Sequence, residues 1–212
     1  MRTSELIAAL TSDPVPEPIH MGRRIAAALV FGLVGALALY TLLLRPRPDF
    51  AEAVDTVRFD LKFIDALALA LLSLLLLVRL ARPDAKPGAL GLWLFAPLVL
   101  LGFAVSVELA ITPSGEWMKR LVGRDWMYCT TMIPMMAAPI LLALIVAMQA
   151  GAPQYPTWTG ALAGTAAAGI AAFLYASQCP DDSPLFVATW YPLAMLICDS
   201  VGALAGRRFL AW

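Results

Sequence analysis

The stretch LKFIDALALALLSLLLLVRL, residues 61–80, consists mainly of leucine and alanine, and it decides the class of fold. A helix needs about 20 predominantly apolar residues to cross the hydrocarbon core of a bilayer. A run of this length with so few charges therefore predicts a transmembrane helix. Asp60, Lys62 and Asp65 stand together at its N-terminal end. They predict an interfacial charge cluster, with the Lys62 ammonium group snorkelling to the headgroups.

Further apolar runs of similar length lie on both sides of this stretch. The chain has 212 residues, of which 61% are hydrophobic and 14% are charged, whereas soluble domains carry about 25% charged residues. The sequence predicts an all-α, polytopic membrane bundle of six transmembrane helices over residues 25–212, preceded by a short cytoplasmic amphipathic leader, residues 1–24. The other five spans are expected at residues 25–44, 89–111, 127–149, 158–177 and 185–206.

Basic residues next to the first and last spans predict the orientation of the bundle. Arg23 and Arg24 directly precede the first span, and Arg207 and Arg208 directly follow the last. Because positive charge is retained in the cytoplasm, we expect both termini there and the first, third and fifth loops outside.

Two carboxylates fall within the predicted spans. Glu108 lies near the outer end of the third span, and Asp199 lies well inside the sixth. Ionisable groups at membrane depth are functional candidates by default, and they otherwise need a partner. Glu108 fits a wetted or arginine-paired carboxylate as well as a functional group, and Asp199 fits either a structural hydrogen bond or a role in signal coupling.

The chain contains three cysteines, and the loop count brings two of them to the same side. Cys129 begins the fourth span, and Cys179 opens the turn CPDDSPLF, residues 179–186. Two interpretations stay open for this pair. It is either a disulfide or a reduced pair that binds a soft metal or reacts with an oxidant, with Asp181 and Asp182 as oxygen ligands or as part of a solvated turn. Cys198 is expected to be a buried, free thiol that packs as a small hydrophobe.

Several motifs resemble those of the NrsF family of bacterial membrane proteins, named as negative regulators of sigma F. They are the opening MRTSELIAALTSDPVPEP, the IP after Cys129, the turn CPDDSPLFVATWY at residues 179–191 and GALAGRR near the end. The resemblance covers essentially the whole chain, and the turn with Trp190 and Tyr191 is its most specific part.

The resemblance implies an anti-sigma factor without enzymatic activity. Such a protein holds an extracytoplasmic-function sigma factor at the inner membrane. It releases that sigma factor under heavy-metal or oxidative stress through two outward-facing cysteines, which map onto Cys129 and Cys179, with Asp181 and Asp182 beside them. No resident cofactor is implied, only transient binding of a soft metal by the two cysteines.

The leader contains a short amphipathic segment, TSELIAALTSD, residues 3–13. Leu6, Ile7 and Leu10 fall on one helical face. A single helix of about ten residues is marginal in water, so we expect a partner or the lipid surface to order it. With the resemblance, these three residues become the candidate contacts with the sigma factor.

Other classes of function fit the sequence less well. A small six-helix transporter or channel is the main alternative, because Glu108, Asp199 and the prolines within the spans could form a midplane site. Motifs typical of membrane enzymes are missing from the sequence. The net charge of zero offers no case for nucleic-acid binding.

Overall fold

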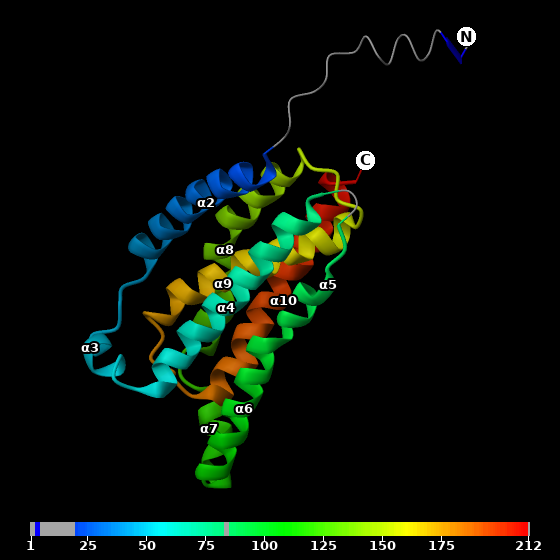
Figure 1. The fold of residues 1–212 in the computed structure, drawn as a ribbon. Coiled ribbons are helices and arrows are strands. Elements are labelled where there is room, and N and C mark those ends of the chain that lie inside the picture. Colours follow the sequence, from blue (N-terminus) through cyan, green and yellow to red (C-terminus); the bar gives the residue numbers. More distant parts are fainter. Residues whose placement is uncertain (1–2, 5–19, 83–84, 212) are drawn as a thin grey trace.

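The computed structural model describes residues 3–4, 20–82 and 85–211 of the chain (Figure 1). All secondary structure in this part is helical. The elements, labelled as in Figure 1, are α2 (Met21–Leu43), α3 (Phe50–Ala53), α4 (Val57–Leu80), α5 (Gly88–Trp93), α6 (Phe95–Ile111), η1 (Ser114–Glu116), α7 (Trp117–Val122), α8 (Trp126–Met148), α9 (Pro156–Ala176) and α10 (Pro184–Phe209).

Within the described residues, six helical runs are long and apolar enough to cross a membrane. The prediction of an all-α bundle with six such helices is therefore confirmed. The runs are Met21–Leu43, Val57–Leu80, Gly88–Ile111, Ser114–Met148, Pro156–Ala176 and Pro184–Phe209. Most of the leader, including the candidate contact residues Leu6, Ile7 and Leu10, lies outside the described residues.

Helix α9 forms the centre of the bundle, and its small side chains explain why. It packs against α10, α4 and α8, and most of its buried residues are glycine or alanine. Small side chains allow helix backbones to approach closely, which supplies van der Waals contact where lipid removes the hydrophobic drive between helices. Helix α2 packs mainly on α8, while α6 runs along α4 and α10 at the edge.

The contact between α9 and α10 is closest at two paired glycines. A Cβ atom on Gly160 would collide with the backbone carbonyl oxygen of Gly202 and would lie 2.7 Å from Cα of Gly206. Gly160 and Gly164 in α9 and Gly202 and Gly206 in α10 form GxxxG spacings, which allow the two backbones to come this close.

The third span is interrupted near its start. Helix α5 ends at Trp93 and α6 begins at Phe95, with Leu94 between them. Pro97 lies four residues after Trp93 and has no N–H to donate to the Trp93 carbonyl, which is the hydrogen bond an unbroken helix would make there. The break lies within the span that the sequence places at residues 89–111.

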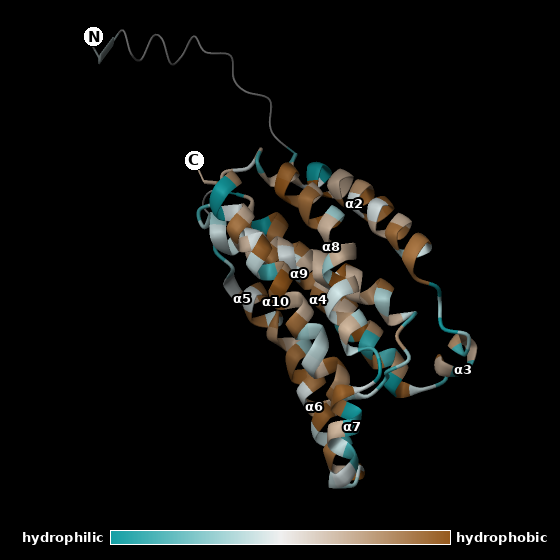
Figure 2. Ribbon diagram, turned by 180° about the vertical axis from the view of Figure 1, so that it is seen from behind, coloured by the Kyte–Doolittle hydropathy of each residue, from teal (hydrophilic) through white to brown (hydrophobic). Residues whose placement is uncertain are grey.

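The bundle has two polar ends separated by apolar helix surface, as Figure 2 shows. Large apolar side chains such as Phe31, Leu42, Phe103 and Leu204 are exposed on the outside of the helices. Exposed apolar surface of this extent matches the finding that six helices are long and apolar enough to cross a membrane. We call the end where α2 begins and α4 and α10 end the leader end, and the opposite end, with α3, α7 and residues 177–183, the cysteine end (Figure 1).

Candidate functional site

Cys129 and Cys179 both lie in the interior of the cysteine end. Both side chains are fully buried, and both thiols are free. Cys129 lies in the first turn of α8, Cys179 follows α9, and the two thiols are within electrostatic range of each other. The structure thus brings the two cysteines that the loop count placed on one side into the same buried region, shielded from solvent.

The carboxylate of Asp182 clamps the turn to two other parts of the chain. Asp182 Oδ1 accepts a hydrogen bond from Lys62 Nζ at 2.6 Å, and Asp182 Oδ2 pairs with Arg47 Nη1 at 2.7 Å. The same Lys62 ammonium group donates to the backbone carbonyl of Cys179 at 2.8 Å. One end of α4 and the link between α2 and α3 are therefore bound directly to the cysteine turn.

Lys62 does not snorkel to the surface, and that expectation is wrong. Its side chain is 0% exposed, and its ammonium group lies 4.9 Å from the centre of the Phe59 ring. Asp182, the Cys179 carbonyl and the aromatic face together replace the water that this charge has lost. Asp65 in the same helix is also buried, so only Asp60 of the predicted interfacial cluster is exposed.

Arg47 strengthens the clamp from the loop side. Its guanidinium group forms a second ion pair with Asp49 at 2.7 Å and holds the pKa of that exposed carboxyl at about 2. Its backbone N–H donates to the carbonyl of Ser177 at 3.2 Å. The hydroxyl of Ser177 also bonds to that of Tyr40 in α2 at 2.7 Å. Arg47 and Lys62 are the functional candidates that sequence reasoning missed; a lysine within an apolar span was the available signal.

Asp181 holds the turn to the start of α8. Its Oδ2 atom accepts hydrogen bonds from the backbone N–H groups of Arg124 and Asp125 at 2.9 and 3.0 Å. Gly123 makes this approach feasible because it adopts a φ of +63°, and a Cβ there would collide with the Phe186 ring. Asp181 and Asp182 are therefore engaged in protein contacts rather than being free to act as metal ligands in this state.

Several buried polar groups around the turn are left unpaired. The hydroxyls of Tyr175, Tyr191 and Ser183 and the amide oxygen of Gln178 have no hydrogen-bond partner among the described residues. Both tyrosines lie within electrostatic range of both cysteines, and the Tyr175 hydroxyl approaches the Cys179 thiol without regular hydrogen-bond geometry. A buried polar group without a partner costs about 1–3 kcal/mol, so these groups are a local source of strain next to the thiols.

The environment of Cys179 decides its resting chemistry. Burial raises the pKa of the Cys179 thiol to about 11, although the nearby Lys62 charge acts in the opposite direction. The thiol is therefore protonated at neutral pH, which suppresses its reactivity because the thiolate is the nucleophile and the metal ligand. No group of three or more candidate metal-ligating side chains occurs in the part of the chain that the structure describes. The two thiols alone could hold a soft cation.

The two carboxylates within the helices have different partners. Glu108, 2% exposed, pairs with Arg58 at 2.7 Å and with Arg120 at 2.6 Å, which matches the arginine-paired interpretation. Asp199 accepts a hydrogen bond from the Thr165 hydroxyl of α9 at 3.0 Å. No hydrogen bond or ion pair between described residues joins Glu108 or Asp199 to Cys129 or Cys179. Cys198 is free and buried, as expected.

Fold and site together define a class: a protein with six helices long and apolar enough to cross a membrane, and with two buried, free cysteines beside an ion-paired turn. The sequence model of the NrsF family, described as "Negative regulator of sigma F", matches residues 10–212. The chain belongs to this family of anti-sigma regulators.

Two relatives align over the full length of both chains. One is the "Probable anti-sigma-F factor NrsF" of Azospira oryzae, 33% identical over 217 residues. The other is the "Anti-sigma-F factor NrsF" of Caulobacter vibrioides, 34% identical over 221 residues. No solved structure matches the chain.

Proposed function

We propose that this protein is a membrane-bound anti-sigma factor without enzymatic activity. It sequesters an extracytoplasmic-function sigma factor at the cytoplasmic face of the bacterial inner membrane and releases it under heavy-metal or oxidative stress. Membership of the NrsF family, the names of the two relatives and the six apolar helices support this proposal. Cys129 and Cys179 are the sensing residues.

The observation that carries the proposal is the burial of both thiols beneath a turn that contacts several helices. Cys179 is linked through its carbonyl to Lys62, and the adjacent Asp182 is linked to Lys62 and Arg47. A chemical change at the thiols cannot be accommodated without movement of this turn, because the side chains around it are packed in the core. Movement of the turn would alter contacts with α2, α4 and α8 together.

Two kinds of chemical signal could act on the buried thiols of Cys129 and Cys179. A soft metal ion can displace both thiol protons and bind the two thiolates, which offsets the cost of ionising buried groups. Alternatively, a peroxide can oxidise the two thiols to a disulfide, accepting two electrons and leaving as water with the two thiol protons. Either product changes the separation and the polarity of the two sulfur atoms within a packed interior.

We assign the binding of the sigma factor to the leader. Leu6, Ile7 and Leu10 would each bury a side chain against the sigma factor, worth roughly 1.5–3 kcal/mol per residue. A helix that orders in a groove of its partner is an established recognition mode. Leu6→Glu or Leu10→Glu should release the sigma factor without any stress signal, whereas Glu5→Gln, off the apolar stripe, should have little effect.

The decisive experiment is co-purification of the intact protein from its own membrane, followed by identification of the bound protein. A sigma factor should be recovered from untreated cells and be lost after metal or peroxide treatment. Cys129→Ser and Cys179→Ser should each abolish this loss, and the double variant should behave as either single one, because members of one unit are not additive. Recovery of no sigma factor from the wild type contradicts the proposal.

The orientation needs a separate test because both native thiols are buried. In a cysteine-free background, Glu52→Cys marks an exposed position at the cysteine end and Gln154→Cys an exposed position at the leader end. A membrane-impermeant maleimide added to spheroplasts should label the first and spare the second. The opposite pattern would place the thiol pair in the cytoplasm and exclude outward sensing.

A further inference from the structure

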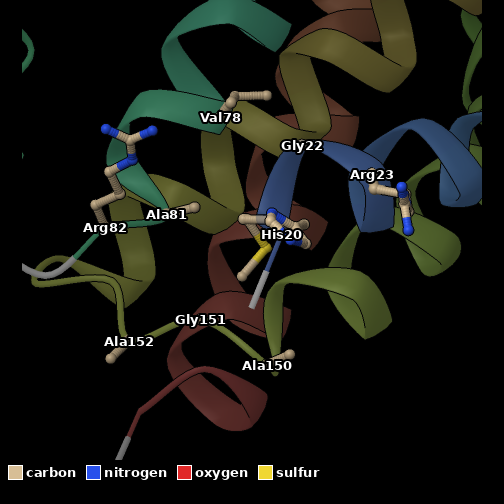
Figure 3. A pocket seen from close by; sticks show the side chains of 10 residues that line it. His20, Gly22, Arg23, Val78, Ala81, Arg82, Ala150, Gly151 and Ala152 are labelled. Atoms are coloured by element: carbon tan, nitrogen blue, oxygen red, sulfur yellow. The ribbon is translucent and has the colours of Figure 1, made fainter. Parts of the chain in front are cut away.

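The leader end of the bundle contains a pocket that the sensing site does not use. It has a volume of about 550 Å³ and is lined by residues from the start of α2, the end of α4 and the loop between α8 and α9 (Figure 3). His20, the residue through which the leader joins the bundle, forms part of the wall. Pockets of this size accommodate ligands or several side chains of a partner.

The charge around this pocket is of one sign. Arg23 and Arg82 stand on opposite sides of His20 in Figure 3, and both belong to the lining. Every charged side chain described at the leader end is basic; the described Arg and Lys residues there are Arg23, Arg24, Arg79, Arg82, Lys86, Arg207 and Arg208.

All ion pairs between described residues lie elsewhere. They join Arg47, Arg58, Lys62 and Arg120 to carboxylates at the cysteine end. The bundle therefore pairs its charges at one end and presents unopposed positive charge at the other, within the described residues. The positive-inside rule accounts for the sign of this charge, but it does not account for a pocket between the charges.

We infer that this pocket is a docking site for an acidic segment of the soluble partner, next to the leader. The inference rests on the proposed function, since the partner is the sigma factor, and adds a contact independent of Leu6, Ile7 and Leu10. Arginines on both sides of the pocket are complementary to carboxylates, which guanidinium groups bind through two parallel hydrogen bonds.

The position of the pocket favours a protein segment over a lipid headgroup. Its walls come from the ends of two helices and from a loop, so it lies on the end face of the bundle rather than between helix sides. Lipid headgroups lie beside helix ends, whereas a soluble protein approaches the end face. A partner held by the leader, which leaves the bundle at His20, would be tethered directly over this pocket.

The test uses the purified protein in nanodiscs, where both ends are accessible and inserted orientation has no effect. The probe is the sigma factor identified by co-purification, produced separately and labelled with a fluorophore. The test variant is the double charge reversal Arg23→Glu with Arg82→Glu. A second variant, Arg23→Gln with Arg82→Gln, removes the two charges without reversing them and is used in case the reversal prevents folding. Arg45→Glu with Lys119→Glu makes the same charge change at exposed sites of the cysteine end and is the matched control.

We expect the double reversal to weaken binding about tenfold or more in neutral phosphatidylcholine nanodiscs, and the control to change it less than about twofold. Added salt should weaken wild-type binding more than binding by the reversed variant, because exposed charges are screened. All variants should keep the helical circular dichroism of the wild type.

Three outcomes would overturn the inference while leaving the proposed function intact. The first is wild-type affinity in the double reversal. The second is a loss of wild-type binding when phosphatidylglycerol is added to the nanodisc, which would identify a lipid headgroup as the occupant. The third is tighter binding after deletion of residues 2–18, which would identify the acidic residues of the leader as the occupant. Failure of the wild type to bind the sigma factor would instead reject the proposed function.

Discussion

Replacing Asp182 with asparagine tests whether the ion-paired clamp holds the cysteine turn in place. Lys62 is fully buried, and Asp182 provides its only ion pair among the described residues. Asp182→Asn keeps the size of the side chain but leaves the Lys62 ammonium group buried without a counter-charge. Loss of one partner from a buried ion pair costs about 3–5 kcal/mol.

Two features of the site reduce this cost. The Asp182 side chain is 20% exposed, and Lys62 keeps its hydrogen bond to the Cys179 carbonyl. We therefore expect Asp182→Asn to lower the free energy of unfolding by about 2–4 kcal/mol. Lys62→Met should cost less, about 1–2 kcal/mol, because it removes the buried charge itself and Asp182 keeps its pair with Arg47.

The double variant distinguishes an ion pair from independent packing effects. If the buried Lys62 charge causes the loss in Asp182→Asn, Lys62→Met should partly restore the stability of that variant. The coupling between neighbours in one network is expected at about 1–3 kcal/mol. Independent effects would instead add, making the double variant the least stable protein of the series.

Tryptophan fluorescence during denaturant unfolding in mild detergent is a suitable assay. The rings of Trp126 and Trp190 lie 5.1 Å apart at the cysteine end, and Trp190 Nε1 donates to the carbonyl of Leu121 at 2.8 Å. Maleimide labelling of Cys179 gives a second readout, which should become faster when the turn is released. Wild-type stability in Asp182→Asn, or no recovery in the double variant, would refute the role assigned to the clamp.

Three other perturbations have defined outcomes. Burial raises the pKa of Cys179 from 9.0 to about 11, so the fold favours the neutral thiol. This preference should add about 3 kcal/mol to the free energy of unfolding below pH 9, and the addition should be lost as the pH rises towards 11. In Cys179→Ser, this part of the pH dependence of stability should be missing. Glu108→Gln should cost about 1–3 kcal/mol and speed hydrogen exchange in α6, since Arg58 and Arg120 lose a shared counter-charge. Gly160→Ile should separate α9 from α10 and reduce stability by more than about 3 kcal/mol, whereas Gly102→Ala, in open space, should be neutral in thermal unfolding.

The sequence alone determined the class of fold. Length and apolar composition decide whether a segment can cross a bilayer, and these are local properties that need no knowledge of neighbours. For the same reason the six apolar helices were predictable. The loop count also placed Cys129 and Cys179 at one end, because two spans, an even number, separate the start of the fourth span from the fifth loop.

Only the tertiary structure decided what surrounds the two thiols. Their burial, the partners of Asp181 and Asp182 and the burial of Lys62 depend on contacts between residues far apart in the chain: 117 positions separate Lys62 from Cys179, and 135 separate Arg47 from Asp182. Neither helix periodicity nor local composition carries information about such pairs. From its helix alone, Lys62 was expected at the lipid headgroups. It is buried because Asp182 and the Cys179 carbonyl, brought by α9 and the turn after it, satisfy its charge inside the bundle.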